Sequence, residues 1–120
     1  MRRDWDIIRE LLLAAEDLAP NERVSLSDFD EYRQFEMSYH AVLLDEAGLV
    51  QASISKELSQ RPKHFYIYRL TWPGHEFLDA IRNESIWAKT KTVITEKGGS
   101  MTFDIVKGLA LSYAKSGLGI

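Results

Sequence analysis

Three side chains that could bind a metal ion or transfer protons lie close together in the segment YRLTWPGHEFLDAIR: His75, Glu76 and Asp79. On a helix, His75 and Asp79 would share one face, as two metal ligands can. The zinc-protease pattern requires a second histidine where Asp79 stands, and one histidine with one carboxylate leaves a divalent ion mostly water-bound. We therefore expect no metal site. In a structural role, Glu76 favours the dipole of a first helical turn and His75 packs or hydrogen-bonds near the cap.

The other candidates for catalysis and cofactor binding are weaker still. No Gly-x-Ser-x-Gly motif occurs, and the GGS segment at residues 98–100 lacks the lysine pattern of a phosphate-binding loop. His40 falls beside Met37 and Leu44 on an expected helix, which predicts a buried, hydrogen-bonded histidine rather than a ligand or a base. The absence of cysteine excludes thiolate zinc sites, disulfides and cysteine nucleophiles, and it suits a reducing cytoplasm. We predict a non-enzymatic, cytoplasmic protein without a cofactor or metal.

The elements that must position these residues follow from the hydrophobic periodicity of a 120-residue chain, 45% hydrophobic and 28% charged. Charged residues interrupt the N-terminal stretch MRRDWDIIRELLLAAEDLA at helical spacing, which indicates an amphipathic helix rather than a signal peptide or membrane span. The pattern predicts helices over residues 4–19, 33–47, 73–82 and 103–116, with strands over residues 23–26, 49–54 and 64–71. A further apolar stripe, ending at residues 98–99, either bends the third helix or begins another.

The order of these elements predicts an α+β fold of the winged-helix type. Gly48 closes the second helix, residues 49–71 form a β-hairpin wing with a long tip, and Thr71 caps the following helix. A typical winged helix has one more helix before the recognition helix, whereas only residues 27–32 are available for it here, so the helix-turn-helix is reduced. We expect a winged-helix-like domain over residues 1–97 and a Gly-Gly joint with a C-terminal helix over residues 98–120.

Charge is distributed unevenly over the two segments that would contact DNA. Residues 27–46, which include the expected recognition helix, hold six acids and one base, although the net charge of the whole chain is only −3. Residues 51–75 hold four bases and one acid. A wing carrying Lys56, Arg61 and Lys63 is able to contact DNA phosphates while the helix contributes little, but such residues also keep an ordinary hairpin tip soluble.

Two other surfaces favour contacts with protein. Phe35, Tyr39 and Val42 fall on the outward side of the second helix together with Ser38, a combination typical of a protein interface. The last helix places Phe103 and Val106 on its inner face, with a set of further apolar residues expected to widen that face: Ile105, Leu109 and Leu111. This helix is expected either to fold back on the domain or to form a homodimer with a second copy.

Two long motifs resemble a known family: SYHAVLLDEAGLV at residues 38–50 and LTWPGHEFLDAIRNESIWAKTK at residues 70–91. With the opening MRRDWDIIRELL and the KGGS joint, they are similar to the bacterial and bacteriophage proteins classed as domain of unknown function family 2513. The resemblance spans nearly the whole chain. It implies a winged-helix-like fold and a prophage or mobile-element setting, and it supplies no catalytic residue.

Two functions therefore remain open. The first is a DNA-associated transcriptional accessory or regulator that contacts duplex DNA through the wing. The second is a protein-binding module that inhibits or redirects a host factor through the outward face of the second helix.

Overall fold

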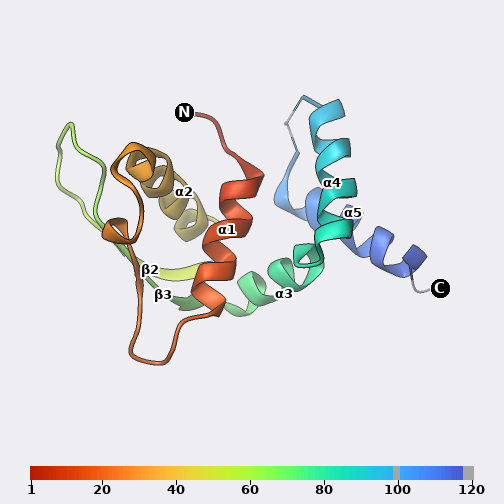
Figure 1. Ribbon diagram of the computed structural model, residues 1–120, viewed down its shortest axis with the longest axis horizontal. Helices are drawn as coiled ribbons and strands as arrows, with labels where there is room; N and C mark the ends of the chain where they lie inside the picture. Colours follow the sequence, from red (N-terminus) through yellow and green to blue (C-terminus); the bar gives the residue numbers. More distant parts are fainter. Residues whose placement is uncertain (99–100, 118–120) are drawn as a thin grey trace. The chain divides into compact units, whose positions relative to one another are not determined.

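The protein, described by a computed structural model over residues 1–98 and 101–117, has a mixed α+β fold (Figure 1). Five α-helices and one three-stranded antiparallel sheet form within these residues, which confirms the predicted α+β class. The chain divides into two compact units, Met1–His75 and Glu76–Ile120. The division predicted at residues 97 and 98 stays a prediction, and Gly99 and Ser100 of the joint lie outside the described residues.

Helix α1 (Trp5–Glu16) begins at Asp4, whose carboxylate accepts hydrogen bonds from the backbone N–H groups of Asp6 (2.9 Å) and Ile7 (3.4 Å). An N-cap of this kind satisfies amides that have no partner inside the helix. The apolar stripe expected from the sequence is buried. It comprises Trp5, Ile8, Leu11, Leu12 and Ala15.

Strand β1 (Val24–Ser25) and two short 3₁₀ turns, η1 (Leu26–Asp28) and η2 (Glu31–Arg33), connect α1 to α2 (Gln34–Glu46). The carboxylate of Asp28 accepts the backbone N–H of Ser25 at 2.8 Å, which stabilises the first turn. Between β1 and α2 the chain therefore forms two single 3₁₀ turns.

The sheet has the order β1-β3-β2, so the first strand lies at an edge, as predicted. Strands β2 (Val50–Ile54) and β3 (Phe65–Leu70) form the antiparallel hairpin, with an irregularity between Gln51 and Ala52. Helices α1 and α2 contact the sheet and each other, and the buried side chains of β3 complete the core of this unit. Those side chains are Phe65, Ile67 and Leu70.

Gly48, two residues after the last residue of α2, has a φ of 72°, a left-handed conformation that glycine adopts without strain and that stops the helix. The N–H of Gly48 bonds to the carbonyl of Asp45 (3.1 Å), and the N–H of Leu49 bonds to the carbonyl of Leu44 (3.0 Å). This is the Schellman arrangement. It buries Leu49 and directs the chain into β2, as the glycine predicted.

Helix α3 (Trp72–Ile81) begins against that same turn. The Thr71 hydroxyl donates to the carbonyl of Gly48 (2.6 Å) and accepts the N–H of Gly74 (3.2 Å), while the N–H of Thr71 bonds to the carbonyl of Leu49 (3.1 Å). A side chain at Gly74 would overlap the backbone carbonyl of Leu49. Thr71 caps α3 as predicted, and it also secures the end of α2.

The second unit contains the remainder of α3, helix α4 (Glu84–Glu96) and helix α5 (Phe103–Gly117). Asn83 caps α4 by accepting the N–H of Ile86 at 3.0 Å, so the stripe after residue 83 is a separate helix rather than a bend. Thr102 caps α5 by accepting the N–H of Ile105 at 3.3 Å.

Helix α5 packs on α4 within this unit. Val106 and Ala110 are fully buried, and the ring of Phe103 meets that of Phe77 edge to face, with centroids 5.6 Å apart. The expected widening of the inner face was wrong in part, because Ile105 and Leu111 are 52% and 44% exposed. Packing on α4 therefore leaves both side chains open to solvent.

Candidate nucleic-acid interface

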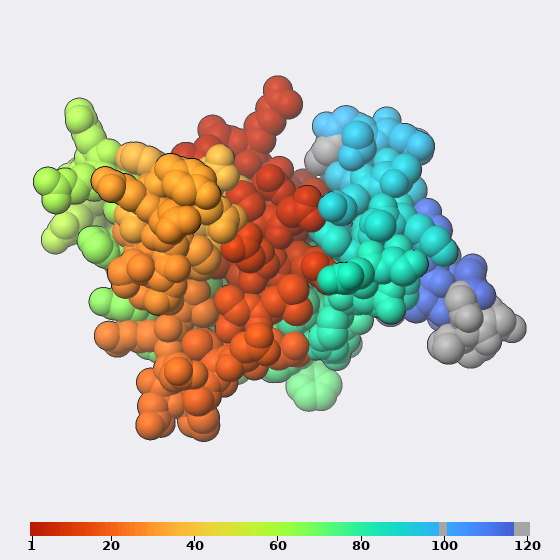
Figure 2. Space-filling model, in the orientation of Figure 1, coloured from red at the N-terminus to blue at the C-terminus, as the bar shows by residue number. Residues whose placement is uncertain are grey.

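The candidate interface is the loop between β2 and β3, residues 55–64, which contains Lys56, Arg61 and Lys63. Figure 2 shows this loop, in light green, projecting from the surface. Its base is fixed by two hydrogen bonds. The N–H of Ser55 bonds to the carbonyl of His64 (2.8 Å), and the hydroxyl of Ser38 donates to the carbonyl of Lys63 (2.8 Å).

Ser38 was predicted on the outward face of the second helix, and this prediction was wrong. Its side chain is buried because it reaches from α2 to the backbone of the hairpin. The small hydroxyl fits between α2 and the loop. Its hydrogen bond to the carbonyl of Lys63 replaces one that this carbonyl would otherwise make to water. The basic loop is therefore attached to α2 as well as to its own strands.

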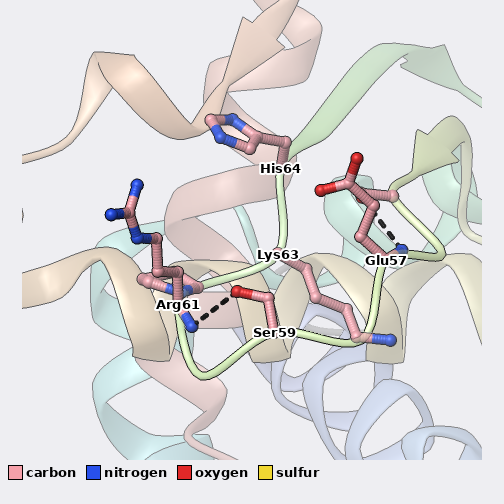
Figure 3. Close-up of a pocket in the computed structure, with 7 residues that line it drawn as sticks. Glu57, Ser59, Arg61, Lys63 and His64 are labelled. Carbon is pink, nitrogen blue, oxygen red and sulfur yellow. Dashed lines mark hydrogen bonds between the residues drawn. The ribbon is translucent and has the colours of Figure 1, made fainter.

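A hollow of about 120 Å³ opens within the loop (Figure 3). The Ser59 hydroxyl accepts the N–H of Arg61 (2.9 Å), and the Ser55 hydroxyl accepts the N–H of Glu57 (3.3 Å), so local side chains shape the turn. The lining residues are Ser55, Glu57, Ser59, Arg61, Pro62, Lys63 and His64. The hollow is polar and small, and its size suits a single phosphate group rather than a nucleoside.

The three basic side chains differ in their relation to this hollow. Arg61 and Lys63 line it, whereas Lys56 lies outside the lining. All three are exposed, and within residues 1–98 and 101–117 none forms an ion pair or a side-chain hydrogen bond. Figure 3 shows the carboxylate of Glu57 and the guanidinium of Arg61 on opposite sides of the loop. The bases are thus available to an anion from solution.

Arg33, the last residue of η2 and the one directly before α2, is not available to an anion from solution. Arg33 forms a two-pronged salt bridge with Glu10 of α1, with N–O distances of 2.7 and 2.9 Å. The hydrogen bonds to Glu10 raise the pKa of Arg33 above its ordinary value. Three acidic residues of α2 are exposed and would repel phosphate: Glu36, Asp45 and Glu46.

The aromatic surface predicted on α2 is partly exposed. Phe35 is 50% exposed, and Tyr39 and Val42 are half-buried, so the three residues form a shallower apolar face than expected. Tyr32, one turn earlier, is 83% exposed and extends this face, although the sequence interpretation had not included it. Its i, i+3 relation to Phe35 was the signal that could have identified it.

The candidate histidine of α2 and the carboxylates of α3 contact other residues of the fold, whereas the side chain of His75 is exposed on α3. His40 is 1% exposed, with Nδ1 2.7 Å from the carbonyl of Glu36 and Nε2 2.7 Å from the N–H of Asp4, which confirms the prediction of a buried, bonded ring. Asp79 forms a salt bridge with Arg82 (2.9 Å), and Glu76 lies 3.9 Å from Lys107. Among the described residues, no group of three or more His, Asp or Glu side chains could hold a metal ion.

Exposed apolar side chains that were not predicted also occur elsewhere in the first unit. Leu58 stands fully exposed at the hairpin tip, and Trp72 is 77% exposed in the first turn of α3. Pro73 and Gly74, which follow Trp72, fix the direction of that turn. They were the sequence signal from which the exposure of Trp72 could have been predicted. In the part of the chain that the structure describes, no helix is both long and apolar enough to cross a membrane.

Comparison with known proteins gives two matches. The family model described as "Hypothetical protein (DUF2513)" matches residues 2–100. An "Uncharacterized protein" of Haemophilus influenzae (strain Rd) is 37% identical over 111 residues, a length that covers 92% of each chain. No solved structure gives a significant match.

Proposed function

The chain belongs to the hypothetical-protein family DUF2513, and we propose that it is a small non-enzymatic protein that binds duplex DNA through its β2–β3 loop. The proposed activity is that of a transcriptional accessory or regulator in a phage or prophage setting, acting in the cytoplasm. One observation carries the DNA-binding proposal. The exposed basic residues of one loop lack acidic partners within the described residues, while Arg33, directly before α2, is paired with Glu10.

The order of elements in the first unit supports a winged-helix-like interpretation. In this interpretation α2 would be the recognition helix, the β2–β3 hairpin would be the wing, and η1 with η2 would replace the missing helix. The charge distribution favours a reversal of the usual roles. The wing would supply phosphate contacts, and the acidic α2 would stay outside the groove.

The strength of such binding follows from counterion release. Each phosphate contact contributes about 0.9 to the slope of log affinity against log salt concentration for duplex DNA, so three contacts predict a slope of roughly −3. Contacts of this type carry no sequence information by themselves. We therefore expect weak, salt-sensitive binding that differs little between duplexes of different sequence.

The experiment is fluorescence anisotropy of a labelled random-sequence duplex, titrated with the full chain at several salt concentrations. The variant K56Q/K63Q is expected to lower the salt slope by about 2, and R61Q by about 1. The matched control is K89Q/K97Q, which removes the same charge from exposed positions of α4 and its C-cap. Equal losses in both double variants, or no binding at low salt, would sink the proposal.

A protein-binding function is the second candidate, and the exposed Tyr32 and Phe35 favour it. Together with Tyr39 and Val42 they give one side of η2 and α2 an apolar, aromatic surface next to acidic residues, the composition found at the centre of protein interfaces. The partner would be a host factor that the protein inhibits or redirects. An acidic rim predicts that this factor presents a basic surface.

Capture of host proteins on immobilised full chain tests this alternative. The variant F35S/Y39S is expected to lose its specific partner, whereas W72S removes an exposed aromatic residue from another element and serves as the control. A partner retained by F35S/Y39S and lost by W72S would place the interface elsewhere. Circular dichroism of each variant checks that α2 is still folded.

A further inference from the structure

The outward face of α5 carries a regular stripe of exposed residues that its packing on α4 does not use. Asp104, Gly108, Leu111 and Lys115 follow one another at spacings of four, three and four, which places them in one line along the helix. Ile105, 52% exposed, borders this line. The stripe is thus apolar at its centre and charged at its two ends.

The two charges cannot pair with each other in one chain. Asp104 and Lys115 are separated by eleven residues, and eleven residues of α-helix rise by about 16 Å. Neither residue forms an ion pair with another side chain in residues 1–98 and 101–117. Each has the sign that favours its own helix end, Asp104 in the first turn and Lys115 in the last.

The stripe is complementary to itself when a second copy is turned end to end. In an antiparallel pair of helices related by a two-fold axis, two residues face each other when their numbers have a fixed sum. Asp104 with Lys115, and Gly108 with Leu111, have the same sum. A single register therefore places both charges opposite their complements and Leu111 opposite a residue without a side chain.

Gly108 provides the space that this register requires. A Cβ atom added at Gly108 would meet nothing within 4 Å, so the helix surface is open there. The 44% exposed side chain of Leu111 would fill this open position on the other helix, as small residues allow close approach of two helices. Because the axis is two-fold, the contact between Leu111 of one copy and Gly108 of the other occurs twice.

We propose that the outward face of α5 is a homodimer interface, in which two copies pair antiparallel, with Leu111 over the partner's Gly108 and Asp104 beside the partner's Lys115. A second copy of this chain is the favoured partner because, when two copies run antiparallel, the stripe brings opposite charges together and places Leu111 against Gly108. The contact is one helix pair, so its area falls below that of a standard interface and the dimer is weak. The proposal does not depend on DNA binding, since no loop residue takes part.

Sedimentation velocity of the full chain, from about 10 µM to about 1 mM, tests the proposal over the range where a small interface forms. The wild-type chain is expected to shift from monomer to dimer. The variants D104K and K115D each place like charges together at both ends of the pair, and each is expected to weaken the dimer about tenfold. The control K89D changes an exposed charge of α4 and is expected to leave the association unchanged.

Two further measurements separate pairing between copies from an effect on each helix alone. An equimolar mixture of D104K and K115D restores opposite charges at both ends, so it is expected to form a heterodimer more tightly than either variant forms a homodimer. The double variant D104K/K115D is also expected to recover association, whereas a role limited to the helix dipole predicts that it has the least stable helix. A monomer at every concentration, or a dimer that the charge changes do not alter, would overturn the proposal.

Discussion

The Nε2 atom of His40 lies 2.7 Å from the backbone nitrogen of Asp4, the residue that caps α1. The other ring nitrogen, Nδ1, lies 2.7 Å from the carbonyl of Glu36. Because a carbonyl only accepts, Nδ1 carries the proton and Nε2 accepts from Asp4, so the ring is the neutral imidazole. One buried side chain of α2 thus holds the beginning of α1 in place.

Replacing His40 with leucine keeps the approximate volume of the side chain and removes both hydrogen bonds. The carbonyl of Glu36 remains bonded within α2, but the N–H of Asp4 loses its acceptor, and we expect the free energy of unfolding to fall by about 1–3 kcal/mol. Urea denaturation measures this change. The control H64A alters an exposed histidine and is expected to shift stability by less than about 0.5 kcal/mol. Equal midpoints for the two variants would contradict the role assigned to His40.

Gly74 and Gly108 are both helical glycines, but the structure predicts opposite results when each becomes alanine. At Gly74 the new methyl group would overlap the carbonyl of Leu49, so the turn between α2 and β2 must shift, at a cost of about 1–3 kcal/mol. At Gly108 the methyl group has open space, and alanine is expected to add up to about 1 kcal/mol of helix stability. Thermal unfolding in dilute solution compares the two. A G74A protein as stable as the wild-type chain would show that the contact with Leu49 is loose.

Thr71→Val removes a hydroxyl without changing the shape of the side chain. The variant loses the N-cap of α3 and the bond to the carbonyl of Gly48, and we expect a loss of about 1–2 kcal/mol in urea denaturation. The matched control is Thr95→Val on the exposed side of α4, which is expected to change stability by a few tenths of a kcal/mol. A cap that contributed nothing would make the two valine variants indistinguishable.

The salt bridge between Arg33 and Glu10 is two-pronged but partly exposed, with side-chain exposures of 29% and 43%. A double-mutant cycle with R33Q and E10Q is expected to give a coupling free energy of about 0.5–1 kcal/mol, decreasing in high salt. Because the pKa of Arg33 is raised in the folded chain, its share of this stability is present below the ordinary pKa of arginine and is lost only as the pH rises past the raised value. The coupling should therefore be equal at about pH 7 and about pH 9. A decrease between these two values would contradict this assignment.

The sequence predicted the elements well because their signals are local. Gly48 ends α2 through its left-handed conformation, Thr71 begins α3 through its hydroxyl, and each signal depends on neighbouring residues only. The structure shortens α1, which was predicted over residues 4–19 and ends at Glu16, since the N–H of Leu18 bonds to the carbonyl of Ala15, three residues back, in a turn. Local chemistry was sufficient for the order of elements and for the α+β class.

The candidate site was predictable only in part, because its remaining features depend on contacts between distant residues. The basic loop is visible in the sequence, but the bond from Ser38 to Lys63 joins positions 25 residues apart and turned a predicted surface serine into a buried one. The pairing of Arg33 with Glu10 likewise crosses 23 residues. Periodicity assigns a face to a residue, and it cannot tell which element covers that face.

The hydroxyl of Thr71 bonds to the carbonyl of Gly48 and to the N–H of Gly74, so one oxygen atom completes the end of one helix and the beginning of another. When a segment opens locally, all of its shared bonds must break in the same event. The last turn of α2 and the first turn of α3 should therefore open together as one cooperative unit. In hydrogen exchange, the amides of Leu49 and Gly74 would then report a single opening reaction, although the β-hairpin separates them in the chain.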